Sequence, residues 1–207
     1  TLAADAADTT APYTGLAGTE FGVDFNPVAD RLRIVSNSGQ SLRINVDSGA
    51  TTTDGNINGG TAGTAISAAA YTNAFAGTVS TTLYAIDGAT GTLYVQNPPN
   101  DGTLSAPLAL GVAGSSVNGF DIDARTNTGY LAATVGGARN LYSVNLGATA
   151  NAATLVMPIA TTEDIRGIAL RARSVTVLGL GDDNRLLGFK PGTPNTIDSN
   201  LAITGLN

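Results

Sequence analysis

Residues 22–49 read "GVDFNPVADRLRIVSNSGQSLRINVDSG", and this stretch decides the fold class of the chain. Its short apolar runs alternate with polar residues at a period of two, which is typical of β-strands with one buried face. Asn-Pro and Ser-Asn-Ser-Gly interrupt the runs, and both are turn sequences. The stretch therefore predicts short antiparallel strands joined by tight turns.

The same order of strands and turns recurs three more times along the chain. The first strands of the four copies end at Phe25, Tyr71, Ile122 and Leu170, which are 46, 51 and 48 residues apart. Each copy closes with a further run: "GATTTDG", "GTLSAPLAL", "AATLVMPIA" and "NTIDSNLAITG". A period near 48 residues, with about four short strands per copy, matches the blade of a β-propeller. We therefore predict an all-β fold, a β-propeller with about four visible blades of short antiparallel strands.

The predicted organisation is an N-terminal edge or donor strand, residues 1–17, followed by a propeller domain, residues 18–207. The expected blades cover about 18–62, 63–112, 113–161 and 162–207. Gly and Ala are frequent in the predicted first strands, as expected where blades converge on a crowded axis. Tyrosines recur at blade positions, which predicts that they pack between blades: Tyr71, Tyr84, Tyr94, Tyr130 and Tyr142.

The composition narrows the function classes. A net charge of −6 argues against nucleic-acid binding, which needs a basic surface. No run approaches 18 apolar residues, so the sequence predicts no membrane span. Zero cysteine excludes disulfides and thiol chemistry. Low Lys and Glu with abundant Thr and Ser resemble secreted bacterial surface proteins, and the absence of a leader at the start predicts a mature or excised segment.

The opening stretch, extended to "GVDFNPVADRLRIVSNSGQSLRINVDSGATTTDG", resembles a family of secreted bacterial, propeller-like domains of unknown function. Further similar segments are "AAAYTNAFAG", "TTLYAID", "LYVQNPPNDGTL" and "GFDI". The resemblance implies a propeller fold and an extracellular or cell-surface location, and it implies no catalytic residues.

The order of the segments differs from that of the family, because residues 183–206 resemble a segment that opens its members. The chain thus resembles a permuted or tandem copy of the family's domain. One interpretation is a homopolymer or tandem array in which residues 1–17 pack against a neighbouring copy, which completes the ring. The alternative is a ring closed within one chain, in which these residues add an edge strand to the last blade.

Three arginines form the first candidate site. Arg31 and Arg33 share one face of a predicted strand, and Arg43 on the next strand can lie beside them. Guanidinium groups bind carboxylates and other anions bidentately, which would make an anion site. The alternative is a set of structural ion pairs with nearby carboxylates, namely Asp24, Asp30 or Asp47.

Two groups of acidic residues are candidates for calcium. Asp121 with Asp123, and Asp182 with Asp183 and Asn184, supply the oxygen ligands that Ca²⁺ prefers. Neither group matches a complete calcium-binding loop. Asp and Asn are also common in turns, where their side chains bond to the backbone without a metal.

Catalysis by an activated nucleophile lacks its usual residues, because the chain contains no His and no Cys. Lys190 in "GFKPG" is the remaining base candidate, and its Gly-Pro setting indicates a turn. We therefore predict a non-catalytic, extracellular structural or adhesive module without a cofactor, which self-assembles into a filament or tandem array. The alternatives are a ligand-binding propeller and a calcium-dependent hydrolase that uses the central channel.

Overall fold

A computed structural model describes residues 1–112, 116–161, 165–170, 177–180, 185–190 and 193–202. The chain divides into two compact units, Thr1–Leu170 and Arg171–Asn207. The described residues are almost entirely strand and turn, with one 3₁₀ helix, η1 at Pro99–Asp101. No helix in the described part of the chain has the length and apolarity needed to cross a membrane.

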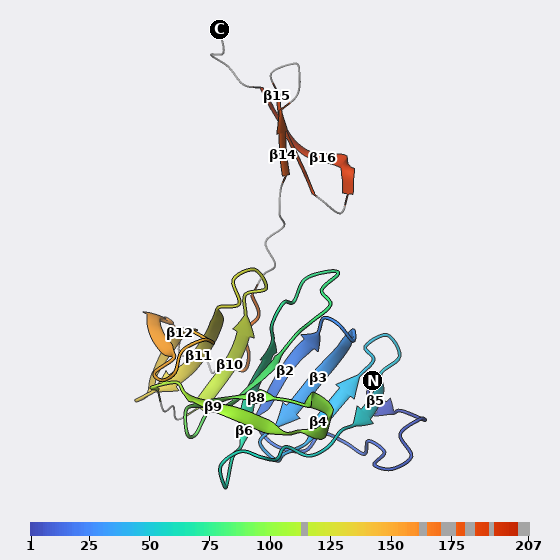
Figure 1. Ribbon diagram of the computed structural model, residues 1–207, viewed down its shortest axis with the longest axis vertical. Helices are drawn as coiled ribbons and strands as arrows, with labels where there is room; N and C mark the ends of the chain where they lie inside the picture. Colours follow the sequence, from blue (N-terminus) through green and yellow to red (C-terminus); the bar gives the residue numbers. More distant parts are fainter. Residues whose placement is uncertain (113–115, 162–164, 171–176, 181–184, 191–192, 203–207) are drawn as a thin grey trace. The chain divides into compact units, whose positions relative to one another are not determined.

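The first unit contains three antiparallel sheets that correspond to the first three predicted blades (Figure 1). The first blade consists of β2 (Phe21–Asn26), β3 (Arg31–Ser36), β4 (Ser41–Ile44) and β5 (Ala50–Thr53). The second consists of β6 (Ile66–Tyr71), β7 (Leu83–Asp87), β8 (Thr92–Gln96) and β9 (Leu104–Ala109). The third consists of β10 (Ser116–Ile122), β11 (Gly129–Val135), β12 (Ala138–Val144) and β13 (Ala153–Pro158). The predicted all-β fold of four-stranded antiparallel blades is confirmed.

The second unit is a smaller antiparallel sheet of three described strands. Its strands are β14 (Val177–Leu180), β15 (Arg185–Lys190) and β16 (Thr193–Ala202). They correspond to the second, third and fourth strands of the predicted fourth blade. The segment that corresponds to its first strand, residues 165–170, belongs to the first unit and lies in no strand there.

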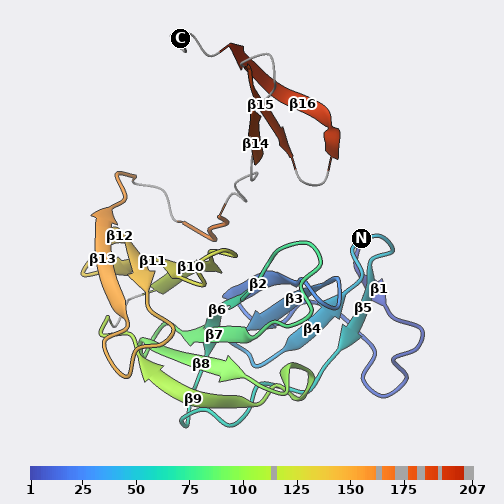
Figure 2. The same cartoon turned by 45° about the horizontal axis from the view of Figure 1, so that its top comes forward.

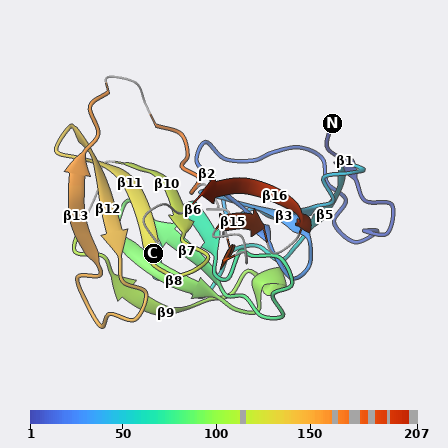
Figure 3. The ribbon, with the colours of Figure 1, turned by 90° about the horizontal axis from the view of Figure 1, so that it is seen from above.

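The first strands of the three complete blades lie side by side, with β6 between β2 and β10. Figures 2 and 3 show the outer strands β5, β9 and β13 at the periphery of this unit. One apolar core lies between the second and third blades and contains Ala70, Ile122 and Tyr142. Another joins the first and second blades through Val35, Tyr71 and Tyr94. Tyr71, Tyr94 and Tyr142 are therefore buried between blades, as the sequence predicted.

The predicted turns form through Asn and Asp side chains. Asn26 Oδ1 accepts the backbone N–H groups of Val28 and Ala29, both at 2.9 Å, between β2 and β3. Asp30 closes that turn with φ of 51°, a left-handed conformation that Asp tolerates better than most residues. Asp87 makes the same kind of bond to the N–H of Ala89 after β7. These bonds explain why many of the acidic residues occupy turns.

The outer edge of the first blade is covered by the N-terminal run. β1 (Ala3–Ala4) pairs with β5 in parallel, and the Asp5 N–H donates to the carbonyl of Thr51 (2.9 Å). Further along, Gln40 accepts the N–H of Ala17 (3.0 Å) and donates to the carbonyl of Gly15 (2.9 Å). In this structure the run lies on its own first blade, and its donation to a neighbouring copy stays a prediction.

The outer edges of the second and third blades carry irregularities of another kind. The register shifts in the β8–β9 pair and again in the β12–β13 pair. Pro107 and Pro158 lie in the outer strands and remove one backbone donor each. Bulges and prolines discourage strand addition at sheet edges, so both blades are poor acceptors of a foreign strand.

Candidate functional site

The first strands contact each other through glycine. A Cβ atom built on Gly22 of β2 would lie 2.4 Å from the backbone nitrogen of Ala69 in β6. A Cβ on Gly119 of β10 would lie 2.5 Å from the backbone nitrogen of Ile168. Real Cβ contacts are never this short, so both positions exclude every residue except glycine unless the backbone moves. The Gly-x-Asp sequences of β2 and β10 thus bring an aspartate close to the following segment.

Each of these aspartates joins two successive first-strand segments. Asp24 Oδ1 accepts the N–H of Phe25 (2.7 Å), and its Oδ2 accepts the N–H of Tyr71 (2.6 Å). Asp121 Oδ1 accepts the N–H of Ile122 (2.7 Å), and its Oδ2 accepts the N–H of Leu170 (2.5 Å). Bonds from N–H groups to a carboxylate are stronger than bonds to a neutral acceptor. We call Asp24 and Asp121 the clasp aspartates.

The clasp aspartates alternate with alanine along the repeat. The equivalent positions in the second and fourth copies are Ala70 and Ala169. One aspartate therefore supplies the acceptors for the N–H groups at the ends of two consecutive first strands. The structural repeat of the first strands is a pair of blades, not a single blade.

The surroundings of Asp24 raise its pKa. The pKa of Asp24 is raised from 3.8 to about 6, mainly because the group is buried and to a smaller extent because of the negative charge of Asp121. The N–H bonds from Tyr71 and Phe25 act in the opposite direction, because they stabilise the ionised carboxylate. A carboxyl group with a raised pKa can serve in acid–base chemistry, so Asp24 is the strongest catalytic candidate in the described chain.

Arg33 forms a second polar junction between the first and second blades. Its side chain is 2% exposed and donates from Nη1 to Asp54 Oδ2 (2.5 Å) and to Ser41 Oγ (3.0 Å). Its Nη2 donates to Asn100 Oδ1 in η1 (2.7 Å), and its Nε donates to the hydroxyl of Tyr71 (3.4 Å). Four partners on two blades surround this guanidinium, and no open face remains for an anionic ligand.

The predicted carboxylate partners of the arginines are wrong. Asp54, directly after β5, pairs with both Arg33 and Arg43, because the β4–β5 register places Arg43 opposite Thr52. Arg43 lies at the rim with 35% of its side chain exposed, and the bond to Asp54 raises its pKa.

The three arginines do not converge on one site. Arg31 donates to the backbone carbonyl of Asp30 (2.7 Å) and does not join Arg33 and Arg43 at Asp54. Asp24 serves as a clasp aspartate, and Asp47 is an exposed turn residue. No predicted pairing of an arginine with Asp24, Asp30 or Asp47 occurs as an ion pair among the described residues.

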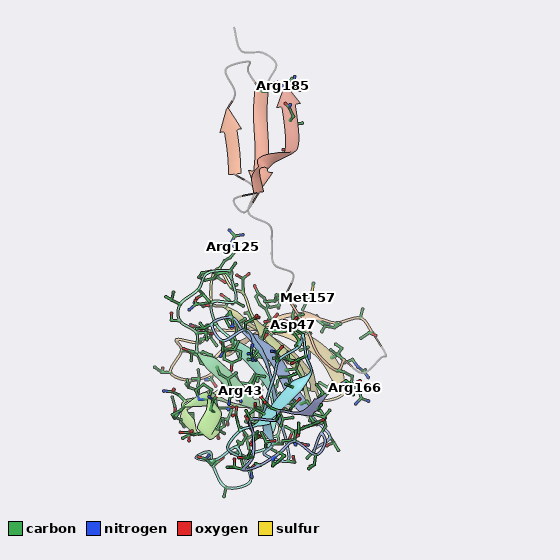
Figure 4. The ribbon with its side chains drawn as sticks, turned by 90° about the vertical axis from the view of Figure 1, so that its right-hand side faces the viewer. Arg43, Asp47, Arg125, Met157, Arg166 and Arg185 are labelled. Carbon is green, nitrogen blue, oxygen red and sulfur yellow. The ribbon has the colours of Figure 1, made fainter. Side chains whose placement is uncertain are left out.

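The calcium candidates do not assemble into a recognisable metal site in the described part of the chain. Asp123 Oδ1 accepts the N–H groups of Arg125 (2.8 Å) and Thr126 (3.1 Å), and these bonds lower its pKa. Arg125 extends outward from this turn (Figure 4). No group of three or more His, Cys, Asp or Glu side chains gathers among the described residues.

The remaining predicted candidates lie in the second unit. Asp182, Asp183 and Asn184 are outside the described residues, and so is the side chain of Lys190 in β15. Two surface clefts of about 340 and 420 Å³ border the third blade, and uncharged residues line both. Neither cleft contains a predicted catalytic or metal-binding residue.

Comparison with known proteins places the chain in a family. The comparison with curated proteins found no match. Among solved structures, virginiamycin B lyase from Staphylococcus aureus is 13% identical with a TM-score of 0.49, over 95% of this chain and 60% of the lyase. The Dos1 propeller is 14% identical with a TM-score of 0.49, over 94% of this chain and 50% of its own. The chain thus spans 50 to 60% of the length of these two structures. The sequence model of one family matches residues 1–169, and the chain belongs to that family, Domain of unknown function (DUF4394).

Proposed function

We propose that the chain is a non-catalytic structural module of a secreted or cell-surface bacterial protein. The observation that carries this proposal is the environment of Arg33, which is buried and bonded to four partners on two blades. A group that binds or transforms a substrate needs a face open to it, whereas this charge serves only the contact between blades. The secreted location rests on the composition and on the family resemblance of residues 22–49.

The clasp aspartates support the same proposal. All four of their carboxylate oxygens accept backbone N–H groups from first-strand segments. Such bonds join successive first-strand segments and thereby position the blades. An adhesive or scaffolding role needs a stiff, repetitive body, and interlocked blades provide one.

A hydrolase is the second candidate, because burial raises the pKa of Asp24 to about 6. This arrangement is typical of a general acid in glycoside hydrolysis. Both proposals assign a role to Asp24, so a substitution of this residue distinguishes between them.

The test compares Asp24→Asn with Asp47→Asn, a matched change at an exposed turn of the same blade. We expect no turnover of ester, glycoside or phosphoester substrates by the parent protein, with or without Ca²⁺. We also expect Asp24→Asn to lower the melting temperature, and calcium or a chelator to leave it unchanged. Turnover that Asp24→Asn abolishes and Asp47→Asn retains would establish the hydrolase instead.

A further inference from the structure

Within the unit Thr1–Leu170, the next-blade side of residues 165–170 is open. Gly167 occupies the repeat position of Gly22 and Gly119, whose missing side chains admit the following segment. At Gly167, by contrast, no atom of the unit Thr1–Leu170 lies within 4 Å of a built Cβ. Its φ is not among the positive values, so the backbone does not require glycine there. Gly167 is thus the residue type that close strand approach requires, although no strand of the unit Thr1–Leu170 lies against it.

The opposite end of the row of blades is also open. The face of β2 that points away from β6 exposes Val23 (50%) and Phe25 (47%). In the later copies the equivalent residues are covered or contacted by the preceding first strand: Ala69 meets Gly22, and Ile168 meets Gly119. By the same spacing, the residue that would meet Gly167 is Val23. We call residues 165–170 the trailing face and the Val23–Phe25 side of β2 the leading face.

The hydrogen bonds of the two faces fit this pairing. A clasp aspartate is needed where the N–H of the following first strand has no other acceptor, as at Tyr71 and Leu170. The Phe25 N–H of the leading face is already bonded to Asp24. The trailing face correspondingly carries Ala169 at the aspartate position. Stacking the two faces would continue the alternation of aspartate and alanine along the first strands.

The charges at the start of each face are complementary. Arg166 is exposed on the trailing segment and extends outward (Figure 4). Glu20 is exposed directly before the leading strand. Stacking Gly167 over Val23 would bring these opposite charges to the same end of the contact, where they favour this register and orientation.

We propose that the trailing face of one copy stacks on the leading face of a second copy, with Gly167 over Val23. This proposal rests on the structural function proposed above and names its partner, which is another copy of the same chain. The contact reproduces the packing already present between β2 and β6 and between β10 and residues 165–170. It joins two different faces, so it propagates head to tail into a filament or a closed ring of copies.

The experiment uses the full chain and blocks each face separately. Val23→Arg places a charge on the leading face, and Gly167→Val fills the open space on the trailing face. Val79→Arg is the matched control, because Val79 is 90% exposed in a loop outside both faces. Sedimentation velocity over a wide concentration range measures the assembly. Circular dichroism and thermal unfolding confirm that each variant is folded.

We expect the parent protein and Val79→Arg to assemble into long species as concentration rises, and each blocked variant alone to stay monomeric. An equal mixture of the two blocked variants should give dimers of twice the monomer mass and nothing larger, because only one intact pair of faces remains. A parent protein that is monomeric at every concentration would overturn the proposal. So would assembly by either folded variant alone, or a mixture without dimers. The activity screen above is independent of these results and still decides the structural function.

Discussion

Removal of the Asp54 carboxylate tests the polar junction most directly. In the folded chain Asp54 is the only acid bonded to Arg33 among the described residues, and the two side chains are 4% and 2% exposed. Asp54→Ala would leave the Arg33 charge buried, with Ser41, Asn100 and Tyr71 as its remaining neutral partners. A buried charge that loses its counter-ion destabilises the native state far more than the pair itself stabilises it.

The expected loss in the free energy of unfolding is about 3–5 kcal/mol, the range for removing one partner of a buried ion pair. The three neutral acceptors favour the lower end, because they continue to solvate the guanidinium. For a domain of this size, such a loss lowers the melting temperature by roughly 6–20 °C. Arg43→Met, which removes only the partly exposed partner, should cost about 1 kcal/mol.

The assay is chemical unfolding of Asp54→Ala, Arg43→Met and Asp47→Ala, followed by circular dichroism at several denaturant concentrations. Asp47→Ala is the control, because this carboxylate is exposed in a turn and its removal should change stability by less than about 0.5 kcal/mol. If Asp54→Ala and Asp47→Ala cost the same, Arg33 does not depend on Asp54 and the junction is not a structural ion pair.

Two further predictions concern the contacts between first strands. The pKa of Asp24 is raised from 3.8 to about 6, so between these pH values the folded state binds a proton that the unfolded state has released. The free energy of unfolding should therefore fall as the pH rises from about 4 through 6. After allowance for solvent screening, the expected decrease is on the order of 1–2 kcal/mol. Unfolding measured across this range should lose that slope in Asp24→Asn, and an unchanged slope would assign it to other groups. Gly22→Ala should cost about 1–3 kcal/mol, because its Cβ would meet the Ala69 nitrogen at 2.4 Å. Gly167→Ala in dilute protein should be nearly neutral, and equal costs at the two glycines would contradict the close packing of β2 on β6.

Much of the fold could be predicted from local patterns. The first strands end at Asn26, Tyr71 and Ile122, within one residue of the predicted ends, because period-two alternation and turn residues act over a few positions. The turn role of acidic residues was also predictable, since an Asp or Asn side chain reaches backbone groups two or three residues away. Asp123 shows this in its bonds to Arg125 and Thr126.

The polar junctions could not be predicted in the same way. Arg33 meets Asn100 across 67 positions of sequence, and the clasp aspartates reach Tyr71 and Leu170 across 47 and 49 positions. The predicted partners of Arg33 were the nearby acids, whereas the register of β4 and β5 selects Asp54. The Gly-x-Asp recurrence at residues 22–24 and 119–121 was the available signal for the clasp, and its meaning depends on which segment packs beside it.

The sequence by itself determined the strands, the turns and the repeat, because these follow from the alternation of apolar residues and from the conformations that Gly, Asn and Asp allow. Only the tertiary structure decided which charges are buried, which carboxylate satisfies which N–H group, and which glycines admit a neighbouring strand. The physical reason is the distance along the chain over which each kind of interaction acts. Backbone preferences act within a few residues, whereas desolvation and hydrogen-bond satisfaction depend on segments brought together from distant parts of the chain. Asp24 and Asp47 are both acids of the first blade, and only their surroundings make one a junction between blades and the other a surface residue.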